Sequence, residues 1–119
     1  MDLFSRGAYQ TTAIERLGVP QAILLDGPAG INFFFGEVTA ASYPTQAVIA
    51  ATWNDELAYA MGDAIGREAD AYGVQGWYAP GMNLHRTAQG GRNFEYYSED
   101  PLLSGKMGAA MTAGPRATT

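Results

Sequence analysis

The sequence of 119 residues contains no cysteine and a single histidine. Without cysteine there is no disulfide framework and no thiolate metal site, and one histidine cannot form a zinc cluster by itself. Lysine and arginine together number seven against twelve aspartates and glutamates, which gives a formal net charge of -5. That balance argues against nucleic acid or an anionic membrane as the main partner. We therefore expect no metal, no cofactor, no nucleic acid and no membrane.

Long hydrophobic runs and nucleotide-binding motifs are absent too. No apolar run reaches the roughly 18 residues that span a membrane. The first residues lack the apolar segment of a signal peptide, which favours a cytoplasmic location. The glycine spacing matches neither GxGxxG nor GxxxxGK[ST], and no GxSxG elbow occurs. With 47% hydrophobic and 16% charged residues, the composition is typical of a globular protein.

The order of the predicted elements indicates an α/β protein. Residues 21–25 form a short apolar run that predicts a strand buried on both faces, and residues 74–79 predict a second strand. Between them, Asn54 is a suitable N-cap for a helix that Gly73 ends. A strand, a helix and a strand in this order predict a right-handed parallel unit. The apolar stripe of this helix is expected to comprise Leu57, Ala60, Met61, Ala64, Ile65, Ala69 and Tyr72.

Shorter helical segments are expected at residues 12–17 and 46–51, and a second long helix near the end of the chain. Asp100 is its predicted N-cap, with Pro101 at the first helical position. Pro115 blocks its continuation, and residues 115–119 read as an aberrant or disordered tail. The apolar stripe of this helix is expected to comprise Leu102, Leu103, Met107, Ala110 and Met111.

Polar side chains follow both predicted strands. Asp26 opens the tight loop Asp-Gly-Pro-Ala-Gly after the first strand, whereas Asn83 and His85 follow the second. In α/β folds, residues at the carboxyl ends of parallel strands carry the chemistry. For Asp26, the alternative is a carboxylate that only caps its own turn. For His85, the alternative is a structural role, since a lone histidine is more often structural than a ligand. Both interpretations stay open at this point.

The segment from Gly90 to Pro101 concentrates an arginine, three carboxylates, an amide and three aromatic rings. Aromatic rings can face the apolar side of a sugar, while a guanidinium and carboxylates can bind its hydroxyls. Burying such a mixture is costly unless the groups pair or meet a ligand. The alternative is a surface loop that leads into a helix cap. Glu99 and Asp100 are explained by that helix start and are not proposed as a catalytic pair.

Several sequence blocks together carry a family resemblance. They are Gly7-Ala-Tyr-Gln-Thr, Asp26-Gly-Pro-Ala-Gly-Ile-Asn32, Ala51-Thr-Trp-Asn54, Gly76-Trp-Tyr-Ala-Pro-Gly-Met-Asn83 and Gly91-Arg-Asn-Phe-Glu-Tyr-Tyr-Ser-Glu-Asp100. From about residue 7 to residue 113, the chain resembles the N-terminal part of the (β/α)8 barrel domain of glycoside hydrolase family 3, with bacterial β-glucosidases as its nearest kin. The resemblance implies that residues 1–119 form a partial TIM barrel of about two βα units, which is incomplete as a domain.

The resemblance implies retaining hydrolysis of terminal, non-reducing β-D-glucosyl residues. That reaction needs two carboxyl groups about 5–5.5 Å apart. In this family, the nucleophile is often within Ser-Asp-Trp and the acid/base usually comes from another domain. Neither segment occurs here, and the Lys-His-Phe block of the family is also missing. The resemblance assigns Asp26 and Arg92 to the hydroxyls of the innermost glucose. Further candidates for substrate binding are Asn32, Asn83, His85 and Glu95.

The resemblance leaves two alternatives to a fragment of a β-glucosidase. One is a non-catalytic carbohydrate-binding piece, and the other is a degenerate fragment without activity. For the β-glucosidase fragment and for the carbohydrate-binding piece, the expected partner is a β-glucoside or an oligosaccharide. The two-stranded sheet would have two open edges, which predicts self-association through them.

Overall fold

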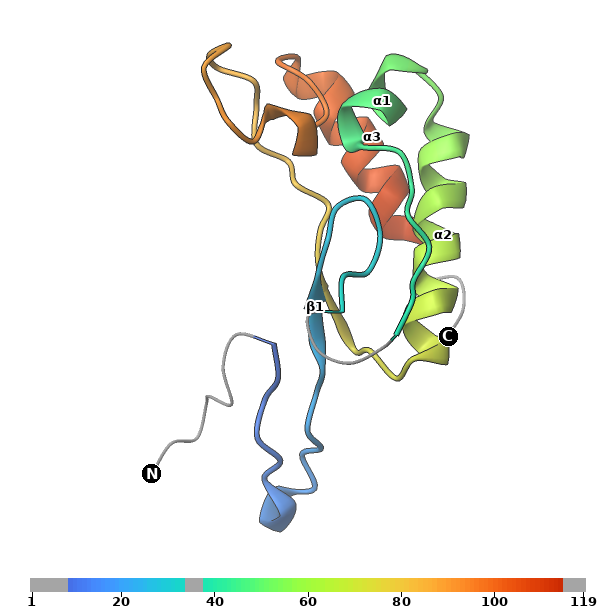
Figure 1. Cartoon of the computed structure of the whole chain (residues 1–119), viewed down its shortest axis with the longest axis vertical. Coiled ribbons are helices and arrows are strands. Elements are labelled where there is room, and N and C mark those ends of the chain that lie inside the picture. The colour runs from blue at the N-terminus through green and yellow to red at the C-terminus, as the bar shows by residue number, and fades with distance from the viewer. Residues whose placement is uncertain (1–8, 34–37, 115–119) are drawn as a thin grey trace.

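The computed structural model describes residues 9–33 and 38–114. Figure 1 shows their arrangement, with a small sheet in the middle and the long helices packed together on one side of it. Gly7 of the first block, the aromatic residues Phe34 and Phe35, and the expected tail 115–119 lie outside the described residues. The elements in chain order are η1 Glu15–Leu17, β1 Leu24–Asp26, α1 Gln46–Ala51, α2 Asp55–Ala71, β2 Gly76–Tyr78, η2 Asn93–Glu95 and α3 Pro101–Ala113.

The parallel strands β1 and β2, joined through α2, confirm the α/β class. Leu25 pairs with Trp77, and Asp26 pairs with Tyr78 at the carboxyl ends of the strands. The prediction that the first strand is buried on both faces is wrong, because only Leu25 is buried while its two neighbours in β1 are half-buried. In the described ranges the sheet has two strands, and the long helices lie on one side of it, so the other face stays partly open.

The outer edge of β1 is closed by other parts of the same chain. The Leu24 amide donates to the carbonyl of Tyr9 at 2.8 Å, and the Thr11 amide donates to the carbonyl of Ala22 at 2.9 Å. Further along, the Asn32 amide donates to the carbonyl of Asp26 at 2.9 Å. One of the two edges that the sequence predicted to be open is therefore already hydrogen-bonded, which leaves less backbone for another chain to pair with.

Helix α2 begins and ends as predicted, but its buried face is rotated from the predicted stripe. The side chain of Asn54 accepts the Leu57 amide at 3.1 Å, and Gly73 has a φ of 67° just after the helix. Met61 and Ile65 are buried as expected, whereas Leu57, Ala60 and Tyr72 are exposed. The buried residues are Ala58, Met61, Gly62 and Ile65.

The rotation of α2 follows from its contact with α3. A Cβ added to Gly62 would lie 2.1 Å from the carbonyl oxygen of Met111, so the two helix backbones touch there. Glycine permits this close approach, and the surface around Gly62 becomes the packing face. A hydrophobicity pattern gives weight to large apolar residues and therefore misses a contact made by glycine.

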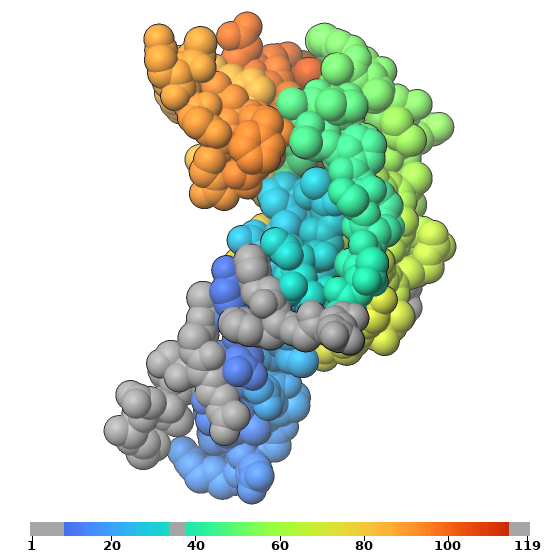
Figure 2. All heavy atoms as spheres, in the orientation of Figure 1, coloured from blue at the N-terminus to red at the C-terminus, as the bar shows by residue number. Residues whose placement is uncertain are grey.

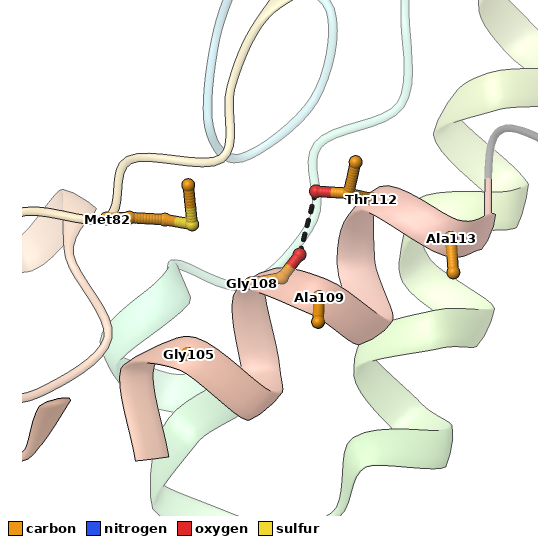
Figure 3. A pocket seen from close by; sticks show the side chains of 6 residues that line it. All are labelled: Met82, Gly105, Gly108, Ala109, Thr112 and Ala113. Atoms are coloured by element: carbon orange, nitrogen blue, oxygen red, sulfur yellow. Dashed lines mark hydrogen bonds between the residues drawn. The ribbon is translucent and has the colours of Figure 1, made fainter. Parts of the chain in front are cut away.

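Helix α3 begins at Pro101 as predicted, with Asp100 Oδ1 accepting the Leu102 amide at 2.9 Å. Met107 and Met111 are buried, but Leu102 is 66% exposed, so its place in the predicted stripe is wrong. Small residues on another face of α3 border a groove that Met82 closes (Figure 3). The groove is lined by Met82, Gly105, Gly108, Ala109, Thr112 and Ala113.

The long connection between β1 and α1 is fastened to α2. Glu68 Oε1 accepts the Ala41 amide at 2.8 Å, and the Tyr72 hydroxyl donates to the carbonyl of Thr39 at 3.0 Å. Phe33 packs edge-on against Tyr72, with ring centroids 5.0 Å apart.

The described ranges contain no helix that is long and apolar enough to cross a bilayer.

Candidate functional site

Asp26 lies at the carboxyl end of β1 and is half-buried. Its Oδ1 accepts the amide of Gly27 at 2.8 Å, so the turn-capping role that the sequence left open is realised. No hydrogen bond within the described part of the chain engages Oδ2. Gly27 has a φ of 121°, and an added Cβ would lie 2.0 Å from the carbonyl oxygen of Gly30. The tight loop therefore needs glycine, and it leaves one carboxylate oxygen of Asp26 available to a ligand.

Arg92 and Glu95 form a bidentate ion pair. Arg92 Nε donates to Glu95 Oε1 at 2.5 Å and Nη2 donates to Oε2 at 2.9 Å. The arginine side chain is 69% exposed and the glutamate side chain only 13%. Because both oxygens of Glu95 are occupied, this carboxylate orients the guanidinium, whose Nη1 stays available for another acceptor.

The charges of this pair shift both pKa values in the directions expected for an ion pair. The hydrogen bond that Arg92 donates to Glu95 and the negative charge of Glu95 raise the pKa of Arg92, and the charge of Asp26 adds to this in the same direction. The hydrogen bond from Arg92 lowers the pKa of Glu95. The charge of Asp26 is the smallest of these influences, and no hydrogen bond or ion pair joins Asp26 to Arg92 within the described residues.

Three interactions hold the base of the loop that carries Arg92. Gly81 and Tyr96 form a parallel bridge, and the His85 amide donates to the carbonyl of Ser98 at 3.2 Å. The buried side chain of Gln46 donates to the carbonyl of Gly81 at 2.8 Å and accepts its amide at 2.7 Å. This role of Gln46 was not predicted from the sequence, where its one signal is a polar residue beside the apolar Ala47-Val48-Ile49 run.

Trp77 links β2 to the loop after β1. Its indole Nε1 donates to the carbonyl of Gly27 at 2.8 Å, directly after Asp26. Trp77 lies in the second predicted strand, and no role in the site was predicted for it. This hydrogen bond makes its indole a natural reporter of changes around Asp26.

The side chains of the other three predicted site residues make no hydrogen bond to Asp26 or Arg92 within the described ranges. Asn32 is exposed and contacts Asp26 through its backbone amide. Asn83 is exposed, and no side-chain hydrogen bond engages it in the described ranges. His85 Nε2 lies 3.2 Å from the carbonyl oxygen of Tyr96, in a groove with Trp53 and Glu99. Of the six candidates, Arg92 and Glu95 are joined by an ion pair, and the common site with Asp26 stays a prediction.

Metal ligands do not gather at this site. Among residues 9–33 and 38–114, no group of three or more histidine, aspartate or glutamate side chains could hold a metal ion. The groove along α3 is lined by glycine, alanine, threonine and methionine and has no titratable group. In α/β enzymes, ligands bind at the carboxyl edge of the parallel strands, which is where Asp26 lies.

Comparison with known proteins identifies the family. The model of the Glycosyl hydrolase family 3 N terminal domain matches residues 3–118, so the chain belongs to glycoside hydrolase family 3. Beta-glucosidase A of Butyrivibrio fibrisolvens is 46% identical over 103 residues, which cover 85% of this chain and 12% of that protein. Beta-glucosidase of Rhizobium radiobacter is 41% identical over 109 residues, which cover 89% of this chain and 13% of that protein.

Solved structures show the same likeness. Beta-glucosidase 3B from Thermotoga neapolitana, in complex with alpha-D-glucose, superposes with a TM-score of 0.83 at 41% identity, over 96% of this chain and 17% of that one. Beta-glucosidase from Kluyveromyces marxianus, in complex with glucose, gives a TM-score of 0.90 at 32% identity, over 97% of this chain and 14% of that one. The chain thus spans less than a fifth of the length of these relatives.

Proposed function

We propose that the chain is part of a retaining β-glucosidase that acts on terminal, non-reducing β-D-glucosyl residues. In this proposal it supplies groups that hold the terminal glucose, whereas the nucleophile and the acid/base belong to segments outside these 119 residues. Residues 1–119 are assigned to a partial N-terminal barrel domain of about two βα units. The names of its relatives support the reaction class, and their length supports the partial domain.

The observation that carries the proposal is the place of Asp26 at the carboxyl end of β1, with one oxygen outside the internal hydrogen bonds, beside an Arg92 that Glu95 orients. Carboxylate oxygens accept hydrogen bonds from sugar hydroxyls, and a planar guanidinium donates to the oxygens of neighbouring hydroxyls. Asp26 Oδ2 and Arg92 Nη1 are the atoms that stay available after the internal hydrogen bonds are made. In this proposal, hydroxyl groups of one glucose meet this acceptor and this donor.

The partial barrel is supported by the way β2 leads into α3. Helix α2 connects β1 to its parallel neighbour β2, and α3 follows β2 and packs beside α2 (Figure 1). A right-handed continuation places the next parallel strand beside β2. The groove between Met82 and the small residues of α3 then serves as the surface on which that part of the barrel packs.

Catalysis by the chain alone is not expected. Retaining hydrolysis requires a nucleophilic carboxylate and a second carboxyl group about 5–5.5 Å from it. Glu95 is occupied by Arg92, and Asp26 is the acceptor for the turn. We therefore assign binding without turnover to the isolated chain.

A glucose titration tests this proposal. In the Trp53→Asn background, Trp77 is the single tryptophan, and its indole reports on the loop after Asp26. We expect saturable quenching or enhancement by glucose and no hydrolysis of an aryl β-glucoside. Asp26→Asn, which keeps the size of the side chain but removes its charge, should weaken binding by about tenfold or more.

The control for the titration is Asp70→Asn, on the exposed part of α2, which should leave glucose binding unchanged. Binding that Asp26→Asn does not alter would remove the assigned site. No binding at all would favour the degenerate fragment. Hydrolysis that disappears in Asp26→Asn would contradict the assignment of binding without turnover.

A further inference from the structure

The side chains of Asp26 and Tyr78 start side by side at the carboxyl edge of the sheet. The two residues are register partners at the ends of β1 and β2. Neighbouring strands lie about 4.8 Å apart, and side chains alternate between the two faces of a sheet, so paired residues share a face. Tyr78 is therefore an immediate neighbour of the carboxylate at which the proposed function places the sugar hydroxyls.

The face that Asp26 and Tyr78 share is the one turned away from the long helices. Leu25, next to Asp26, is buried, and Trp77, next to Tyr78, packs against the hydrophobic core. Because these two side chains point towards the helices, those of Asp26 and Tyr78 point to the opposite, partly open face. On that side the molecule is hollowed between the strand region and the orange segment that carries Arg92 (Figure 2).

Tyr78 presents an aromatic ring on this face in a supported position. Its ring packs edge to face with that of Tyr9, with centroids 6.2 Å apart and an interplanar angle of 74°. The carbonyl of Tyr9 accepts the Leu24 amide at 2.8 Å, which anchors Tyr9 on β1. With Tyr9 in place, Tyr78 is still 50% exposed. The ring is therefore held from one side and accessible from another, which lowers the entropic cost of binding against it.

A carboxylate beside an accessible ring matches the two kinds of surface on a pyranose. In β-D-glucose the hydroxyls stand around the rim, and the C–H bonds form two apolar faces. Small-molecule sites combine aromatic walls with a few placed polar groups. Tyr97, one of the three rings between Gly90 and Pro101 that the sequence offered for a sugar, is instead buried.

We infer that Tyr78 is a substrate-binding residue, whose ring stacks on a C–H face of the glucosyl unit that Asp26 holds. This contact rests on the proposed function and extends it, because it adds an apolar wall to a site so far described by charged groups. It also defines the ligand class as a cyclic sugar with a flat C–H face. An acyclic polyol carries similar hydroxyls but has no such face.

A glucose titration of ring variants, followed by NMR of the sugar, tests the contact. Tyr78→Phe keeps the ring and should bind glucose within about twofold of the wild type, whereas Tyr78→Leu loses the flat ring and should bind about fivefold or more weakly. Glucose C–H protons over an aromatic ring shift upfield. We expect this shift with the wild type and Tyr78→Phe but not with Tyr78→Leu, and a purely structural role of Tyr78 would not produce it.

Two controls accompany the titration. Tyr59→Leu removes a ring of similar exposure, 40%, from α2 and should change neither the affinity nor the shift. Glucitol, an acyclic polyol, should show no upfield shift with the wild type. Circular dichroism checks that each variant is folded, and the shift in the wild type still tests the contact if Tyr78→Leu does not fold.

The outcomes separate the contact of Tyr78 from the site of Asp26. Glucose binding that Asp26→Asn weakens, but that lacks the upfield shift or is unchanged in Tyr78→Leu, would overturn the stacking and leave the proposed function standing. Equal losses in Tyr78→Phe and Tyr78→Leu would also overturn it, because the hydroxyl would then be the group that matters. Binding with the shift that Asp26→Asn does not alter would support the stacking and remove Asp26 from the site. No glucose binding at all would overturn both.

Discussion

The side-chain amide of Gln46 spans the peptide groups of Gly81, donating to its carbonyl at 2.8 Å and accepting its amide at 2.7 Å. Gln46 begins α1 and is fully buried, whereas Gly81 lies just after β2. The pair therefore ties α1 to the start of the segment that carries Arg92. Figure 2 shows this upper part of the molecule, with the orange and teal segments in contact above a hollow beside the blue strand region.

Removal of this amide should destabilise the chain. Gln46→Ala leaves both backbone groups of Gly81 without their partner, and each unsatisfied group costs about 1–3 kcal/mol. We expect a lower urea midpoint, or complete unfolding if the chain has little stability to lose. Gln21→Ala, which breaks only an exposed side-chain bond to Gln10, is the control and should change stability by less than about 0.5 kcal/mol. Equal effects of the two variants would contradict the role assigned to Gln46.

The contact between α2 and α3 should be sensitive to a single methyl group. At Gly62, an added Cβ would lie 2.1 Å from the carbonyl oxygen of Met111, so Gly62→Ala must push the helices apart at a cost of about 1–3 kcal/mol. At Gly105 in α3 an added Cβ meets nothing within 4 Å, and Gly105→Ala should stabilise the helix by about 0.5–1 kcal/mol. Thermal melts should therefore shift in opposite directions, and two shifts of the same sign would show that the close contact is wrong.

The loop after Asp26 should tolerate only glycine at position 27. Gly27→Ala places a side chain on a φ of 121° and a Cβ 2.0 Å from the carbonyl oxygen of Gly30, and the backbone strain costs of order 1–3 kcal/mol. We expect the hydrogen bond from Trp77 to Gly27 to break, which a change in tryptophan emission would reveal. Gly91→Ala, where an added Cβ meets nothing within 4 Å, is the control. Unchanged emission in Gly27→Ala would mean that the loop adapts.

The ion pair of Arg92 and Glu95 should make a small contribution to stability that depends on pH. Because the folded pKa of Glu95 lies below its ordinary value of 4.5, the contribution is present above that value and disappears as the pH falls through the folded pKa. Wild type and Glu95→Gln should therefore differ slightly in melting temperature at neutral pH and converge in acid. Added salt should reduce the difference as well, because the arginine is exposed. A difference that grows in acid would have the wrong sign.

Local signals in the sequence predicted the element boundaries well. Asn54 and Asp100 cap their helices, and Gly73 ends α2 in a left-handed conformation, because caps depend on groups only a few residues apart. The helix expected at residues 12–17 is limited to the three residues of η1, and the strands are shorter than predicted. The short helix at 46–51 is confirmed.

Packing was predicted less well, since it depends on partners far away in the chain. The exposure of Leu57 and Leu102 and the burial of Gly62 follow from where α2 meets α3. Likewise, His85 was grouped with the strand-end residues but lies in a groove with Trp53 and Glu99. The spacing of residues along the sequence does not determine which of these side chains meet in the folded chain.

The sequence by itself determined the α/β class, the helix caps and the family, because these depend on local hydrogen bonding and on the order of residues along the chain. The tertiary structure alone decided that Glu95 orients Arg92, that Gln46 holds Gly81 and that the edge of β1 is closed. The physical reason is that hydrogen bonds and charge interactions act over a few ångströms in space, and only the folded chain determines which groups come within that range.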